Sequence, residues 1–157
     1  MENIVHNEMG LVHLLASVVA LVSGTIVLFS QKGTKRHKTV GYIYLISMLV
    51  VLTTALMIYR LFGGFNVFHF IAIVGFFYIF VGFLPVLIKP KNWIKRHVYF
   101  MYWSVIGLYA AFVAEIMVRI PSTPFWWMVG LGVAVVTATG AYFYTKHKEK
   151  WNSFSNL

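Results

Sequence analysis

Five long apolar segments dominate this sequence and leave few alternatives for its fold. They cover residues 9–30, 40–59, 67–88, 98–118 and 125–145. An α-helix rises about 1.5 Å per residue, so some 20 residues cross the roughly 30 Å hydrocarbon core of a bilayer. Lipid offers the backbone no hydrogen-bond partners, and five short segments cannot close a barrel. The sequence therefore predicts an all-α, polytopic bundle of five transmembrane helices.

The overall composition agrees with a membrane location. Hydrophobic residues make up 60% of the 157 residues and charged residues only 11%, which is more apolar surface than a soluble domain can bury. The length suits a single domain over residues 1–157. Cysteine is absent from the sequence, which excludes disulfides, thiolate metal sites and covalent haem attachment. The net charge of +9 does not indicate nucleic-acid binding, because the basic residues stand in short clusters between apolar segments.

These basic clusters predict the orientation of the helices. Four Lys or Arg residues lie in 31–39, four in 89–96 and three in the C-terminal tail. They put 11 of the 13 positive charges on one side of the bundle, which the positive-inside rule assigns to the cytoplasm. We therefore expect a protein of the cell (inner) membrane with its N-terminus outside and its C-terminus in the cytoplasm. We also expect the first helix to be retained, because no positive charge precedes it as in a signal peptide.

Four histidines stand in pairs at the ends of the first four predicted helices. His13 and His69 lie near the predicted outer ends of the first and third, while His37 and His97 open the second and fourth. A Lys-Arg pair precedes each of the two inner histidines. This similarity predicts a four-helix core of two pseudo-repeated hairpins, with the fifth helix outside the repeat. A twofold axis between the hairpins would bring His13 towards His69 and His37 towards His97.

Two such pairs fit the axial positions of haem iron. Haem iron needs only two protein ligands, whereas zinc usually takes three or four. We therefore predict two bis-histidine haems b, one near each membrane face, that carry electrons across the bilayer. Nearby basic side chains would neutralise the haem propionates; these are Lys35, Arg36, Lys95 and Arg96 at the inner site, and Arg60 or Arg119 at the outer one.

Helical periodicity places three of these histidines on predicted interior faces. The residues that share a face with them are Ser17, Ala20 and Gly24 for His13, Gly41, Tyr44 and Met48 for His37, and Met101, Ser104 and Leu108 for His97. The face that follows His69 is less regular. A simpler interpretation is that interfacial histidines anchor helix ends and that the Lys-Arg-His triplets only direct topology.

Glu115 and two methionines are further candidates. Arg119 follows Glu115 by four residues, a spacing that favours a structural ion pair over a proton-accepting role. Met48 and Met101 stand near the inner histidines and have the chemistry of copper ligands. Methionines in apolar helices are more often packing residues, however.

Two resemblances extend this interpretation. The segment 13–41, with His13, Lys32-Gly33-Thr34, His37 and Gly41, resembles the start of the bacterial membrane-protein family called domain of unknown function 2306. Residues 97–101 and 110–119 resemble that family's second signature, but the family name implies no activity. The histidine layout is also similar to cytochrome b561 and related di-haem bundles, where helices n and n+2 hold each haem. This similarity implies a transmembrane oxidoreductase that exchanges electrons with a quinone or another small molecule.

Two other functions fit the sequence. An accessory subunit that binds a membrane-protein partner would use its histidines structurally. A small metal transporter would use His, Met and Glu115 along a pore, although no broken helix or charged path is evident. Four acidic residues leave little capacity for general acid–base chemistry, so we do not predict a hydrolase.

Overall fold

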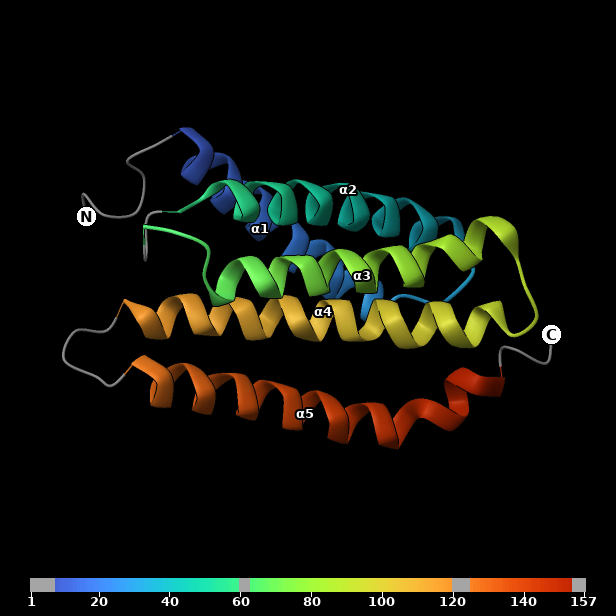
Figure 1. Cartoon of the computed structure of the whole chain (residues 1–157). Coiled ribbons are helices and arrows are strands. Elements are labelled where there is room, and N and C mark those ends of the chain that lie inside the picture. Colours follow the sequence, from blue (N-terminus) through green and yellow to red (C-terminus); the bar gives the residue numbers. More distant parts are fainter. Residues whose placement is uncertain (1–7, 60–62, 120–124, 154–157) are drawn as a thin grey trace. The chain divides into compact units, whose positions relative to one another are not determined.

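The computed structural model describes residues 8–59, 63–119 and 125–153, and every regular element in these ranges is an α-helix (Figure 1). The helices are α1 (Glu8–Phe29), α2 (Lys35–Met57), α3 (Val67–Ile88), α4 (Trp93–Val118) and α5 (Phe125–Ser153). All five are long and apolar enough to cross a bilayer. The all-α fold, with five helices long and apolar enough to span a membrane, is therefore confirmed in the described residues. The four-helix core, the pseudo-repeat and the single domain stay predictions.

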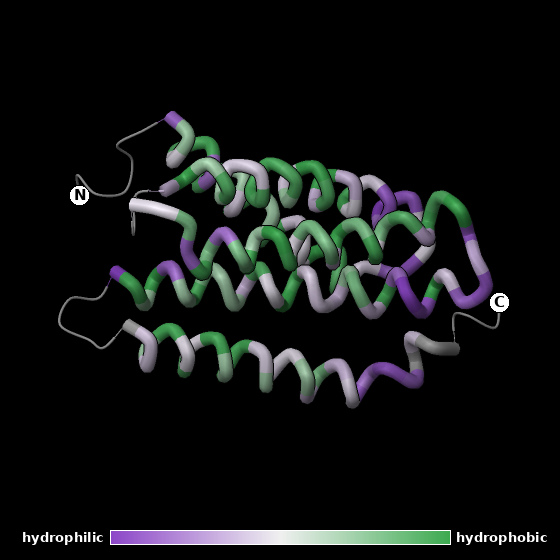
Figure 2. Tube along the Cα trace, in the orientation of Figure 1, coloured by the Kyte–Doolittle hydropathy of each residue, from purple (hydrophilic) through white to green (hydrophobic). Residues whose placement is uncertain are grey.

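Three helices extend beyond the apolar segments that predict them. α2 begins at Lys35 because Thr34 caps it, with the Thr34 side chain accepting a 3.2 Å hydrogen bond from the N–H of His37. α4 begins at Trp93, and α5 continues to Ser153 through the hydrophilic turns that Figure 2 colours purple. Capping and backbone hydrogen bonds can extend a helix past the end of its apolar segment. The length of the apolar segment therefore underestimates the length of these helices.

The first of two compact units comprises residues 1–76, and in its described part α1 packs along α2. Small residues make this approach possible, since Ala20, Ser23 and Gly24 of α1 are all buried. The first part of α3 adds Gly75, where a Cβ would lie 2.5 Å from Cδ2 of Leu52. Close packing of α1 on α2 therefore sets the surroundings of His13, which lies on α1.

The second unit comprises residues 77–157, and there α4 packs along α5. A Cβ at Gly140 would lie 2.8 Å from Cγ2 of Ile106, so glycine permits the close contact. At the same level the buried hydroxyl of Tyr102 donates a 2.7 Å hydrogen bond to the Gly140 carbonyl. On the α3 side, Gly82 lies against Met101 of α4.

Candidate functional site

Burial of the predicted interior faces agrees with the helical periodicity. The residues that share a face with His13, His37 and His97 include six buried ones, Ala20, Gly24, Tyr44, Met48, Ser104 and Leu108. The three histidines themselves are half-buried, at the ends of these faces. His69, whose face was the least regular in the sequence, is the most buried histidine among the described residues, at 1% exposure.

His37 forms part of a side-chain cap on the end of α1. Its Nδ1 lies 3.2 Å from Oγ of Ser30, and that hydroxyl donates to the Val27 carbonyl at 3.0 Å. A hydroxyl has one proton to give; when Ser30 gives it to Val27, Ser30 accepts from His37 and the proton of the neutral ring resides on Nδ1. The lone pair of His37 therefore resides on Nε2.

His97 has the same tautomer through a different partner. Its Nδ1 lies 2.9 Å from the carbonyl oxygen of Gly82 on α3. A carbonyl only accepts, so Nδ1 is the donor and Nε2 holds the lone pair. This contact joins the start of α4 to α3 within the second unit, much as His37 joins the start of α2 to the end of α1.

His13 is bound to α2 through Thr54. Its Nδ1 lies 2.8 Å from Oγ1 of Thr54, which donates to the Val50 carbonyl at 2.7 Å. The Thr54 proton is thereby engaged, so His13 donates from Nδ1 and its lone pair is also on Nε2.

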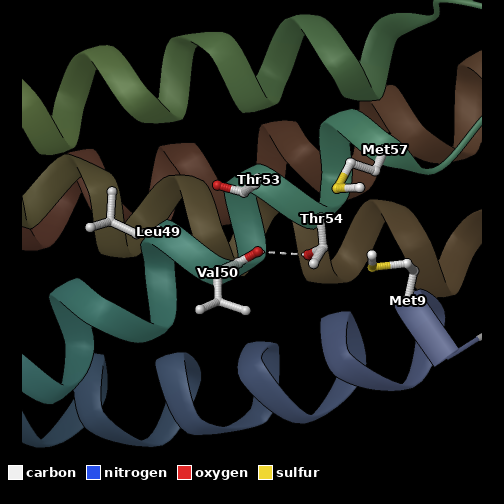
Figure 3. A pocket seen from close by; sticks show the side chains of 6 residues that line it. All are labelled: Met9, Leu49, Val50, Thr53, Thr54 and Met57. Carbon is white, nitrogen blue, oxygen red and sulfur yellow. Dashed lines mark hydrogen bonds between the residues drawn. The ribbon is translucent and has the colours of Figure 1, made fainter.

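Thr54 also lines a cavity of about 360 Å³ beside α1 and α2 (Figure 3). The other lining residues are Met9, Leu49, Val50, Thr53 and Met57. None of these side chains carries a charge, and Figure 3 shows the two methionines extending from α1 and α2. The cavity therefore offers no acid or base for catalysis, and its lining suits an apolar occupant.

His69 differs from the other three histidines in its hydrogen bonding. The backbone N–H of Asn66 donates to its Nδ1 at 3.2 Å, so Nδ1 is unprotonated and the proton is on Nε2. This Nε2–H is buried and has no hydrogen-bond partner within the described residues. The rings of Tyr59 and Phe65 lie against the imidazole, with centroids at 4.6 and 5.1 Å. To ligate iron through Nε2, His69 would have to move its proton and lose the Asn66 bond.

The predicted propionate partners differ in their surroundings. Lys35, Arg36, Lys95 and Arg96 are all exposed, on the first turns of the helices that carry His37 and His97. Arg119 is bound to Glu115, with 3.1 Å between its Nη1 and Oε2, and also donates to the Glu115 carbonyl. This is the structural ion pair that the four-residue spacing favours. Arg60 lies outside the described residues.

Lys32 forms a second part of the α1 cap. The sequence patterns did not predict this role for Lys32. Its Nζ donates to the carbonyl oxygens of Val27 and Leu28, at 2.8 and 2.9 Å. These are orphan acceptors of the last helical turn, which a cation satisfies well. Burial lowers the pKa of Lys32 from 10.5 to about 8, because the charged form loses its hydration.

The candidate copper ligands occupy packing positions. Met48 is buried at 3% exposure, and the Met101 thioether lies against Gly82. Within the described residues, no group of three or more His, Cys, Asp or Glu side chains is placed to hold a metal ion. Haem iron needs only two protein ligands, so haem binding does not depend on such a group.

Comparison with known proteins gives a family but no activity. A model of the family described as "Predicted membrane protein (DUF2306)" matches residues 10–144. No curated protein and no solved structure matches the chain.

Proposed function

This chain belongs to that family of predicted membrane proteins, and from its own residues we propose that it is a b-type cytochrome-like electron carrier whose haem is held by His37 and His97. A haem b, when bound, would supply a one-electron iron centre. The ligands and charge partners of such a haem would be side chains of this chain.

The main support is the shared tautomer of the two histidines. A histidine that binds a metal through Nε2 almost always donates its Nδ1–H to an oxygen, which orients the ring and makes Nε2 more basic. Ser30 accepts this bond from His37, and the Gly82 carbonyl accepts it from His97. Each ring would therefore offer an unprotonated Nε2 to iron without a change of tautomer.

Charge and exposure at the same helix ends also support the proposal. The exposed pairs Lys35-Arg36 and Lys95-Arg96 each precede a half-buried histidine. Cations at these positions would pair with propionate groups while the apolar ring enters between helices. Their position in the basic clusters also leads us to propose that this haem lies at the cytoplasmic side of the inner membrane.

A second haem on His13 and His69 stays a prediction from the sequence. His13 has the ligand tautomer, but His69 presents Nε2–H and uses Nδ1 as an acceptor. The present hydrogen bonds thus support one haem rather than two.

Helix anchoring is the competing explanation, and His147 shows why it must be tested. This half-buried histidine in α5 lies with Nδ1 at 2.9 Å from the Phe143 carbonyl, so the tautomer also occurs in a ring for which we propose no cofactor role. His147 is therefore a matched control for the two proposed ligands.

The test is an absorption spectrum of the full chain, purified in detergent from haem-supplemented cells, before and after reduction with dithionite. We expect Soret and alpha bands of a six-coordinate b-type haem, lost in His37→Ala and in His97→Ala and unchanged in His147→Ala. Ser30→Ala, which removes only the Nδ1 acceptor of His37, should weaken haem retention about 10- to 100-fold. A colourless protein, or a spectrum that survives both ligand substitutions, would refute the proposal.

A further inference from the structure

We propose that His69, together with Tyr59 and Phe65, binds the carbonyl oxygen of a membrane-dissolved quinone at the start of α3. The site itself follows from the geometry of the first unit. The choice of a quinone as its ligand rests on the proposed electron-transfer function.

The cap of α3 determines which nitrogen of His69 carries the proton. Asn66 occupies the N-cap position, since its Oδ1 accepts from the N–H of Phe68 at 3.0 Å and its carbonyl accepts from that of Phe70. The N–H of Asn66 donates to Nδ1 of His69 in return. This is the reciprocal pattern of a capping box, with His at the position that Glu or Gln usually occupies. The cap therefore holds the proton on Nε2 and leaves that nitrogen as a donor.

The Nε2–H donor of His69 is buried. The His69 side chain is 1% exposed, and Nε2 has no partner in the described part of the chain. Native proteins keep few buried unpaired donors without a ligand or ordered water to accept the bond. Among the described residues, the site thus lacks one acceptor atom.

The residues around His69 indicate what kind of molecule would supply the hydrogen-bond acceptor for Nε2–H. Tyr59 and Phe65 lie against the imidazole at interplanar angles of 34° and 28°. These aromatic faces suit a flat, conjugated molecule, since offset stacking contributes beyond simple burial. Tyr59, Phe65 and Asn66 carry no charge, so the acceptor should belong to a neutral molecule. A quinone is flat and neutral, has carbonyl acceptors and exchanges single electrons.

Two of the rings that lie against His69 are at the surface. Tyr59 and Phe65 are 48% and 64% exposed, so neither is locked in the core. Phe65 follows Gly63 and Gly64, and a Cβ on Gly64 would meet nothing within 4 Å. The proposed ligand would reach Nε2 by displacing one of these two rings.

Lipid ester carbonyls are the other source of a neutral acceptor in a membrane. They lack a flat ring to stack on Tyr59 and Phe65, so we favour the quinone. The experiment must nevertheless separate the two sources.

The test uses the full chain as purified, whatever its haem content, in phosphatidylcholine nanodiscs that contain no quinone. Decylubiquinone labelled with ¹³C at its carbonyls is added, its dissociation constant is measured, and the carbonyl stretch is followed by infrared difference spectroscopy. We expect saturable binding with a carbonyl band moved to lower frequency, as a hydrogen bond produces. His69→Leu should weaken binding about tenfold, the equivalent of one lost hydrogen bond.

Two variants separate the donor from the cap. His69→Gln keeps a usual capping-box residue and restores an N–H donor, so binding should be largely retained. Asn66→Ala removes the N-cap side chain but leaves the imidazole, so it should lower stability more than quinone affinity. If His69→Leu does not fold, His69→Glu replaces it, because an ionised Glu can cap α3 but offers no donor.

Equal quinone affinity in the wild type and His69→Leu would overturn the proposal, as would absence of binding to the wild type. A shifted lipid ester band in quinone-free nanodiscs that disappears in His69→Leu would assign the donor to lipid and also overturn it. Haem binding through His37 and His97 is measured separately by absorption. A haem-binding protein that ignores quinone would refute only this inference, and a haem-free protein that binds quinone would refute only the proposed function.

Discussion

At the scale of the residue, one hydrogen bond decides which nitrogen a histidine can use. His37 and His97 donate from Nδ1, whereas His69 accepts at Nδ1 from a helix cap. All three look alike in the sequence, as polar residues at the end of an apolar segment. The pattern Asn-x-x-His at the start of α3 is the one local signal that could have identified His69 as a capping residue.

Lys32 provides a prediction about pH at this scale. Because burial lowers its pKa to about 8, the Lys32 amine should become reactive towards acylating reagents as the pH rises through 8, well below the range of an ordinary lysine. Competitive labelling followed by mass spectrometry measures this directly. If Lys32 reacts only near pH 10, like an ordinary lysine, the proposed desolvation of its charge is wrong.

The same shift has a consequence for stability. Between about pH 8 and 10.5 the unfolded chain holds the Lys32 proton more tightly than the folded protein, so folding becomes more favourable as the pH rises through this window. Below pH 8 both states are protonated, and the full cost of burying the charge is present. The thermal midpoint of the wild type should therefore rise relative to that of Lys32→Met between pH 7.5 and 10. The comparison cancels the titration of the other lysines.

At the scale of the element, glycines set how closely helices pack. We expect Gly140→Ala to destabilise the α4–α5 pair by about 1–3 kcal/mol, because its Cβ would lie 2.8 Å from the branched side chain of Ile106. Gly130→Ala in the same helix is the control; its Cβ would meet nothing within 4 Å, and better helix propensity should make it neutral or stabilising.

Unfolding of the two glycine variants in mixed detergent micelles measures the difference. Ile106→Val, which trims a methyl from the contact, should recover part of the loss in Gly140→Ala. Equal stability of the Gly130 and Gly140 variants would show that α4 and α5 are not held at this distance.

At the scale of the whole molecule, the asymmetry of charge predicts the orientation of the chain in the membrane. A fluorescent protein fused after Leu157 should fluoresce, and alkaline phosphatase fused there should be inactive, because the predicted topology puts 11 of 13 basic residues on that side. Phosphatase fused after Val118 should be active. The reverse result at either position would contradict the proposed topology, and with it the cytoplasmic placement of the proposed haem.

The sequence by itself determined the fold class, the five helices long and apolar enough to span a membrane, and the family. Long apolar segments must form helices in lipid. The apolar segment 67–88 predicted both ends of α3, Val67–Ile88, without a structure. Only the tertiary structure decided what the polar groups do. The tautomers of the four histidines follow from their hydrogen bonds with Ser30, Gly82, Thr54 and Asn66. Lys32 caps α1. Hydrophobic periodicity carries no information about hydrogen-bond partners. The partners of His13, His37 and His97 lie on other helices or helix ends that meet these histidines in space, whereas the Asn66–His69 cap is local.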